Sequence, residues 1–311
     1  MSNLNRRQVL KAIGLTAGAA VLGEAGAVAA PIAPKAGGGF VYSLNMSTIR
    51  GHNLGFVKEL EVAAKAGFTS VEIWIDTLQT YLQSGGSLTE AKKIIGGLGL
   101  KVEDAIGFAP WLADDEATRK KALEQLQREM EMLAQIGCHR IAAPPAGVTK
   151  GPVLDLDVVT ERYLTILKMG EETGVMPQLE MWGGSQNLKH ISQVLYVATQ
   201  CGNANARILL DVFHIFKGQS AVESLNYVGH HAQDIFHVND YPAGISPELI
   251  SEPDRIYCGD GIAPLKEILQ IVKKPERPLV ISFEVFNKSY YAQDALTVAK
   301  TALKKMKEVA S

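Results

Sequence analysis

The sequence predicts an α/β protein of the (β/α)8 TIM-barrel class, folded as a single domain after an N-terminal signal peptide. Two observations predict this class. Short apolar segments alternate with amphipathic helical segments along most of the 311-residue chain, as expected of a parallel sheet covered by helices. There are eight apolar segments, the number that closes a barrel, and a barrel of this kind takes about 250 residues.

The N-terminus is predicted to be a signal peptide that covers residues 1–29. Arg6-Arg7 precede a mildly apolar stretch over residues 12–22, and Ala27-Val28-Ala29 forms a small-residue cleavage site. The apolar stretch is too short and too rich in glycine to span a membrane. The paired arginines resemble the twin-arginine export motif, while a Sec-type signal or an uncleaved anchor is the alternative.

We therefore expect the twin-arginine export machinery to be a partner of this chain and to deliver it, already folded, to the bacterial periplasm. Residues 30–39 are rich in Pro, Gly and Ala and predict a linker. Residues 40–311 are left for the barrel domain.

The composition excludes some partners and some chemistry. The formal net charge is −2 and no long basic run is present, so charge does not attract this chain to nucleic acid. Its three cysteines, Cys138, Cys201 and Cys258, are widely spaced and lack a zinc or redox signature. We expect them to be isolated thiols.

The elements of the barrel follow one another in a regular order. Amphipathic helices are predicted over Phe56–Ala66, Ala117–Ile136 and Val158–Thr173, and glycines precede several strands. The eight strands are predicted over Phe40–Asn45, Ser70–Trp74, Lys101–Phe108, Arg140–Pro144, Met176–Trp182, Arg207–Phe213, Asp234–Asn239 and Leu279–Phe286.

The carboxyl ends of the last four strands carry Glu180, Asp211, His237 and Glu284. Catalytic residues of TIM barrels lie at these ends. Each of the four stands among apolar residues, where a charge is costly unless it is paired or bound to a metal. Three carboxylates and one imidazole at one barrel mouth predict a site for one divalent metal ion. Such ligands suit Mn, Mg or Co, and Zn also fits.

The chain from about Phe40 to Ala310 resembles the xylose-isomerase-like TIM-barrel superfamily, and in particular its inosose isomerase/dehydratase and ketose 3-epimerase groups; the resemblance is most specific in the second half. The resemblance rests on four motifs: Asp211-Val212-Phe213-His214, His237-Val238-Asn239-Asp240, Asp254–Gly261, in which Cys258 stands where proline is common, and Ser282–Asn287. It implies that the metal is held by the four strand-end residues. It also implies that His214 and Arg255 contact substrate oxygens.

This resemblance implies an isomerase or epimerase of a free sugar or polyol ketone. The reaction requires a proton to be removed beside a carbonyl, and a metal-stabilised enediolate would form. Glu180 and Glu284 are the natural pair to remove and return the proton. Glu72 and Trp111 are further candidates for substrate binding. Trp74 and Trp182 could form walls of the pocket, and Asp240 could orient a metal ligand.

Three other functions use the same barrel. A lyase or hydratase acting on keto-sugars, 3-keto-glycosides or keto-inositols could use the same site, and it stays open as the main alternative. A related DNA-repair endonuclease would need further histidines, and none follows Asp104 in the third strand. A non-catalytic sugar-binding protein would not need both glutamates. Barrels of this family often associate, so a homo-oligomer is also expected.

Overall fold

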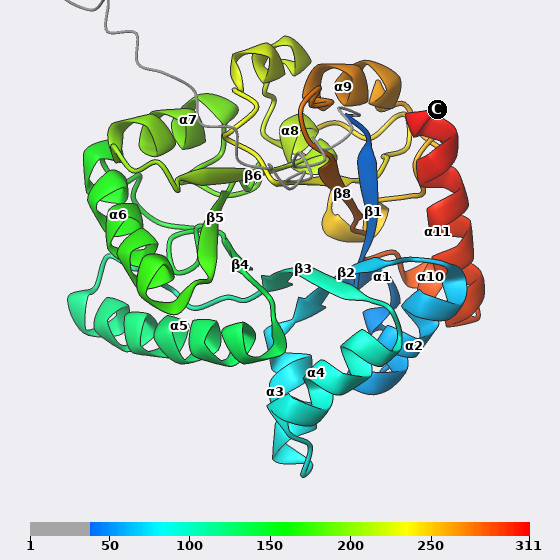
Figure 1. The fold of residues 1–311 in the computed structure, drawn as a ribbon. Helices are drawn as coiled ribbons and strands as arrows, with labels where there is room; N and C mark the ends of the chain where they lie inside the picture. Colours follow the sequence, from blue (N-terminus) through cyan, green and yellow to red (C-terminus); the bar gives the residue numbers. More distant parts are fainter. Residues whose placement is uncertain (1–37) are drawn as a thin grey trace, which may run out of the picture. The chain divides into compact units, whose positions relative to one another are not determined.

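The computed structural model describes residues 38–311, so the predicted signal peptide and almost all of the predicted linker lie outside the described residues. Eight parallel strands form one sheet in the order β3-β2-β1-β8-β7-β6-β5-β4, and helices surround them (Figure 1). The strands are β1 Phe40–Asn45, β2 Ser70–Trp74, β3 Lys101–Ile106, β4 Arg140–Ala143, β5 Met176–Glu180, β6 Arg207–Asp211, β7 Ile235–Val238 and β8 Leu279–Phe283.

The barrel is nearly closed. β1 pairs with both β2 and β8, whereas no backbone ladder joins β3 to β4 in residues 38–311. Side chains bridge this seam instead. Arg140 on β4 donates from Nη1 to the backbone oxygen of Glu103 on β3 at 3.2 Å and to its carboxylate at 3.1 Å. The TIM-barrel prediction is confirmed, with a seam that is closed by side chains.

The helices lie between the strands in sequence and outside them in space. They are α1 Ser47–Arg50, α2 Phe56–Ala66, α3 Ile75–Gln83, α4 Leu88–Gly97, α5 Glu116–Ile136, α6 Leu156–Thr173, α7 Ile191–Gln200, α8 Val212–Lys217, α9 Leu265–Val272, α10 Lys288–Tyr291 and α11 Ala295–Ala310, with short 3-10 turns at Val222–Tyr227 (η2) and Glu252–Asp254 (η3). α5 and α6 begin after Asp115 and Asp155, whose carboxylates accept hydrogen bonds from the first turn. These aspartate caps explain why both helices start one or two residues before their predicted ranges.

Several strands are shorter than predicted at their carboxyl ends. The sequence pattern extends the sixth strand to Phe213, but β6 ends at Asp211. The Asp211 carboxylate accepts hydrogen bonds from the backbone N–H groups of Phe213 and His214 and so starts α8. The apolar residues after the strand therefore belong to a short helix that the pattern did not separate from the strand.

The buried apolar core lies between the sheet and the helices, with Val71, Leu209 and Ile281 fully buried. The three cysteines are free thiols, as predicted, and all three are buried. Within residues 38–311 no helix has the length and apolar character that crossing a membrane requires.

Candidate active site and metal centre

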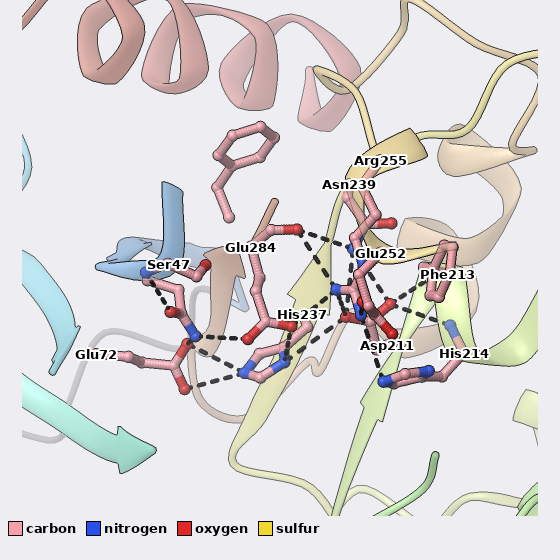
Figure 2. A network of polar contacts seen from close by, with 12 residues as sticks. Ser47, Glu72, Asp211, Phe213, His214, His237, Asn239, Glu252, Arg255 and Glu284 are labelled. Carbon is pink, nitrogen blue, oxygen red and sulfur yellow. Dashed lines mark hydrogen bonds and ion pairs between the residues drawn. The ribbon is translucent and has the colours of Figure 1, made fainter. Parts of the chain in front are cut away.

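Three of the four predicted metal ligands lie together at the barrel mouth. Asp211 ends β6, His237 lies on β7 and Glu284 follows β8 directly. One ligand atom from each comes within 4.8 Å of the others, and all three side chains are buried. Figure 2 shows these residues in one network of polar contacts. Two hard carboxylate oxygens and one imidazole nitrogen form a candidate divalent-metal site.

The orientation of His237 is set by Glu72. The Nε2 atom of His237 lies 3.1 Å from the Glu72 carboxylate, which holds a proton on Nε2 and turns Nδ1 toward the other ligands. Nδ1 lies 3.2 Å from Glu284 and 3.7 Å from Asp211. It makes no well-directed hydrogen bond to any residue in 38–311. A carboxylate behind a histidine ligand is the usual support of a metal site, so the residues present fit a divalent ion.

The charges at this site also favour a cation. Burial would lower the pKa of His237, but the Glu72 and Glu284 carboxylates raise that pKa well above its ordinary value. The imidazole thus holds an extra proton among carboxylates when no metal is bound. A divalent ion can replace that proton, because metal and proton compete for the same nitrogen.

Glu180 faces the same cavity but lies outside this group of three. Burial raises the pKa of Glu180 to about 8, the charge of His237 lowers it, and the negative charge of Glu284 raises it further. A carboxyl group of this kind exchanges its proton close to neutral pH, as an acid or base in proton transfer must. This position suits acid/base chemistry, and ligation by Glu180 stays a prediction.

Glu284 behaves differently although it is equally close to the cavity. Burial alone would raise its pKa, but the positive charges of His237 and Arg255 lower the pKa well below the ordinary range. Its Oε2 atom accepts a hydrogen bond from Arg255 Nη1 at 2.8 Å. The site thus holds one glutamate that readily takes a proton and one that stays ionised.

Arg255 is buried and lines the cavity. Besides Glu284, its Nη1 atom also donates to Asp211 Oδ2 at 2.8 Å, and Nη2 pairs with Glu252. The guanidinium lies 4.4 Å above the ring centre of Phe213. Most of the N–H groups of Arg255 therefore already bind carboxylates. The arginine neutralises the negative charge of these carboxylates and holds them in place beside the candidate metal site.

His214 lines the cavity, and one of its ring nitrogens is buried without a hydrogen-bond partner in residues 38–311. Burial and the charge of Arg255 lower the pKa of His214 well below its ordinary value, so the ring is neutral at pH 7. Its Nε2 atom lies 3.3 Å from Arg255 Nη2, which can only donate. The proton of the neutral ring therefore lies on Nδ1, which has no partner in the described part of the chain.

The cavity has a volume of about 390 Å³ and a largely aromatic wall. Trp74 and Trp182 line it, as predicted, and Phe108 and Phe286 complete the wall without having been predicted. Trp74 packs against both phenylalanines at ring distances of 5.3 and 6.1 Å. Thr149 and Ser185 add hydroxyl groups to the lining.

Two predicted substrate-binding residues do not line the cavity. Trp111 is buried, and its indole N–H donates to the backbone oxygen of Pro144 at 2.8 Å, so it packs beneath the barrel mouth. Glu72 is fully buried and bound to His237. The structure corrects the proposed role of Glu72 from a substrate ligand to the group that orients His237.

Several residues of the network were missed or given another role by the sequence analysis. Asn239 was missed, and its Nδ2 atom donates to Asp211 at 3.1 Å and to the backbone oxygen of Glu284 at 3.2 Å. Asp240 accepts from the backbone N–H groups of Gly259, Gly261 and Ala263. It therefore anchors the loop that carries Arg255 and does not touch a predicted ligand. The only available signal for Asn239 was its place in a motif at the end of a strand.

Comparison with known proteins places this site in a family. A family model described as the xylose isomerase-like TIM barrel matches residues 60–309. The chain belongs to this family. The sequence-based assignment to the superfamily is thereby confirmed.

Related proteins agree with this assignment. An inosose isomerase of Halalkalibacterium halodurans is 26% identical over 267 residues, which cover 83% of this chain and 93% of that protein. An inosose isomerase of Bacillus subtilis is 26% identical and covers 63% of this chain and 72% of its own length. The prediction of an enzyme of the isomerase and epimerase class is confirmed by such relatives.

Solved structures show the same fold. The IOLI protein, whose crystal structure holds a zinc atom, has a TM-score of 0.80 at 23% identity and covers 88% of this chain and 98% of its own. The D-psicose 3-epimerase of Clostridium cellulolyticum has a TM-score of 0.70 at 17% identity and covers 88% of this chain and 100% of its own. At these identities the likeness establishes the barrel alone.

Proposed function

We propose that the protein is a divalent-metal-dependent isomerase or epimerase that acts on the ketone form of a free sugar or polyol by moving a proton beside the carbonyl. The observation that carries the proposal is the convergence of Asp211, His237 and Glu284 on a cavity that Glu180 also faces. The relatives named inosose isomerase support this reaction class. The zinc atom in the IOLI protein supports metal dependence.

Asp211, His237 and Glu284 would hold the ion. When bound, a divalent ion at this position supplies Lewis-acid polarisation of a carbonyl oxygen, and this makes the neighbouring C–H group more acidic. Mn, Mg, Co and Zn all accept oxygen and imidazole ligands, so each of these four ions fits the ligand set.

Glu180 is the residue whose carboxyl group takes and returns the proton. Its raised pKa of about 8 makes its carboxylate a stronger base than an exposed glutamate. Glu284 stays ionised beside Arg255. In an epimerase it would serve as the second proton-transfer group on the other side of the substrate carbon, whereas an isomerase needs only one.

His214 and the aromatic wall orient the substrate. His214 lines the cavity, where a hydrogen bond from its ring to a substrate oxygen on which negative charge develops would lower the barrier to proton removal. Trp74, Trp182, Phe108 and Phe286 exclude water and present flat apolar faces to a sugar ring.

A product survey tests this function. The protein is loaded in turn with Mn, Co, Mg and Zn and incubated in D2O with ketoses, inososes and 3-keto-glycosides. We expect an isomer or epimer that carries deuterium at the carbon beside the carbonyl. A dehydrated or cleaved product would replace the proposal with the lyase alternative, and no turnover with any ion would contradict both.

A further inference from the structure

One buried asparagine connects three parts of the active site. Asn45 is the last residue of β1 and is fully buried. Its Nδ2 atom donates to Glu72 Oε2 at 3.2 Å and to Glu284 Oε1 at 3.0 Å. Its Oδ1 atom accepts from the indole N–H of Trp74 at 3.0 Å and from the backbone N–H of Ser47 at 2.9 Å. All four hydrogen bonds that the amide can form are made.

These partners allow only one orientation of the Asn45 amide. Turning it over would place its oxygen against two carboxylates and its NH2 group against two N–H donors, so four attractive contacts would become repulsive. An aspartate has the same shape but would bring a negative charge to Glu72 and Glu284, and a leucine of similar size forms no hydrogen bond. The position therefore requires both a neutral donor and an acceptor.

Each partner leads to a different part of the site, and Figure 2 labels two of them, Glu72 and Glu284, beside His237. Glu72 holds Nε2 of His237 and thereby aims its Nδ1 atom. Glu284 belongs to the candidate metal ligands. Trp74 belongs to the aromatic wall of the cavity. Within residues 38–311, the Asn45 side chain is the one group that is hydrogen-bonded to all three.

We propose that Asn45 is a positioning residue that holds the Glu284 and Glu72 carboxylates at fixed positions relative to Trp74. The candidate metal ligands and the aromatic wall of the cavity then keep a constant distance and orientation. This inference rests on the proposed function, because it assumes that Glu284 and His237 hold an ion. Asn45 acts through these residues and does not line the cavity itself.

The test compares Asn45→Leu with Thr48→Val as a matched control. Thr48 is also fully buried near the end of β1, and its hydroxyl donates to the backbone oxygen of Phe283 at 3.0 Å, next to Glu284. Both changes remove buried hydrogen bonds at nearly the same place, but only Asn45→Leu removes donors to the carboxylates. The affinity for Zn²⁺ and Mn²⁺ is measured by calorimetry, and folding by thermal denaturation.

We expect Asn45→Leu to weaken ion binding by about 10–100-fold, as the loss of an outer partner of a metal ligand typically does. Thr48→Val should lower the melting temperature but keep the affinity within about twofold, because it leaves both carboxylates supported. Equal affinity in Asn45→Leu and the parent, or an equal loss in both variants, would overturn the proposal.

Trp74→Phe tests the link to the cavity wall, and the ion affinity of this single variant can be measured even if Asn45→Leu fails to fold. The change removes the indole N–H group that holds Asn45 Oδ1 and leaves the Ser47 contact. We expect a loss of ion affinity of about threefold to tenfold in the parent and none in the Asn45→Leu background, because residues that share a contact are not additive. Additive losses would show that Trp74 and Asn45 act separately.

The crystal structure of ion-free Asn45→Leu separates this proposal from the proposed function. It requires neither ion nor substrate. We expect the Glu284 or Glu72 carboxylate to move by about 1 Å or more, the size of displacement that impairs catalysis about a hundredfold. Unchanged carboxylates would overturn the positioning role even if the enzyme proves active. A parent protein that binds no divalent ion would instead contradict the proposed function.

Discussion

Glu180 and Glu284 face one cavity, yet their neighbours give them opposite proton affinities. Glu284 lies against Arg255 and His237, whose positive charges lower its pKa. Glu180 forms no ion pair with an arginine of residues 38–311, and burial raises its pKa to about 8. The difference supports the proposed role of Glu180 in proton removal, since a carboxylate with a higher pKa is the stronger base.

Replacing Glu180 by glutamine should lower exchange of the substrate α-proton by about 10²–10⁴-fold, the usual contribution of a positioned acid/base group. In the parent, the exchange rate should rise with pH as Glu180 loses its proton. A bound cation lowers the pKa of Glu180, so in the ion-loaded enzyme the increase in exchange rate should be centred at a pH below 8. The measurement is deuterium exchange followed by NMR over a range of pH. A rise of the same size in Glu180→Gln would show that another group is the base.

Glu59 on α2 should make stability depend on pH. Burial raises the pKa of Glu59 to about 7, against the opposing charge of Arg50. The folded state therefore binds the proton more tightly than the unfolded state. The contribution of Glu59 to the free energy of unfolding is fully present below pH 4.5, the pKa of this residue in the unfolded chain. It is lost as the pH rises through about 7, the pKa of this residue in the folded protein. This contribution amounts to about 3 kcal/mol.

Urea denaturation of Glu59→Gln checks this expectation. The variant should lose the pH dependence that Glu59 causes between pH 4.5 and 7 and should be more stable than the parent at pH 8 by about 1–3 kcal/mol. Glu61→Gln is the control on the same helix, because Glu61 forms only a surface ion pair with Lys65. It should change stability by less than about 0.5 kcal/mol. A parent and a Glu59→Gln variant with the same pH dependence would contradict the buried-acid explanation.

At the scale of single residues, the sequence predicted which side chains meet at the barrel mouth better than it predicted their supporting contacts. Asp211, His237 and Glu284 could be predicted because each lies at or next to the carboxyl end of a strand, where side chains meet at the barrel mouth. The roles of Glu72 and Trp111 could not. The alternation of side chains along a strand shows which residues point into the barrel. It does not show how deep they lie, and the depth determines whether a side chain lines the cavity or contacts another side chain.

At the scale of elements, the loop after β5 packs closely on α8. A Cβ atom on Gly183 would lie 2.3 Å from the backbone oxygen of His214 and 2.4 Å from the backbone nitrogen of Gly218. Neither backbone atom can move without shifting the helix. The glycine therefore sets the distance between the Trp182 side of the cavity and His214.

Gly183→Ala should destabilise the protein by about 1–3 kcal/mol, as overpacking does. It should also slow proton exchange by about a hundredfold, because His214 would be displaced. Gly184→Ala is the neighbouring control, since its Cβ atom would meet only the side chain of Lys217, at 3.2 Å. Its effects should be several-fold smaller. Urea denaturation and deuterium exchange measure both, and equal effects would contradict the close-packing argument.

The element boundaries show where sequence patterns stop being informative. β1 and β2 have the predicted bounds. β6 ends early because the Asp211 side chain caps α8, and the residues that follow are as apolar as the strand. A side chain that ends one element and starts another cannot be recognised from hydrophobic periodicity alone.

At the scale of the whole molecule, alternation along the chain was enough to predict the barrel, because each strand and its helix are local in sequence. Contacts across the ring were not predicted. Asn45 and Glu284 are 239 positions apart, and their hydrogen bond exists only because β1 and β8 are neighbours in the sheet. The side-chain closure between β3 and β4 was likewise not evident from either strand.

Export is a separate expectation for the full chain and concerns residues outside the described range. Replacing Arg6 and Arg7 by lysine should leave the precursor in the cytoplasm if the twin-arginine machinery carries it. The parent should yield a periplasmic product that starts near Ala30. Fractionation followed by N-terminal sequencing measures this, and unchanged export of the lysine variant would indicate a Sec-type signal.

The most direct measurement is an anomalous difference map from crystals soaked with Mn²⁺. We expect one strong peak at the barrel mouth, bonded to Asp211, Glu284 and the Nδ1 atom of His237 at about 2.0–2.3 Å, the range of metal–ligand distances in proteins. Glu72 should keep its contact with Nε2 of His237. A peak elsewhere, binding through Nε2, or no peak at saturating Mn²⁺ would contradict a metal centre at this site.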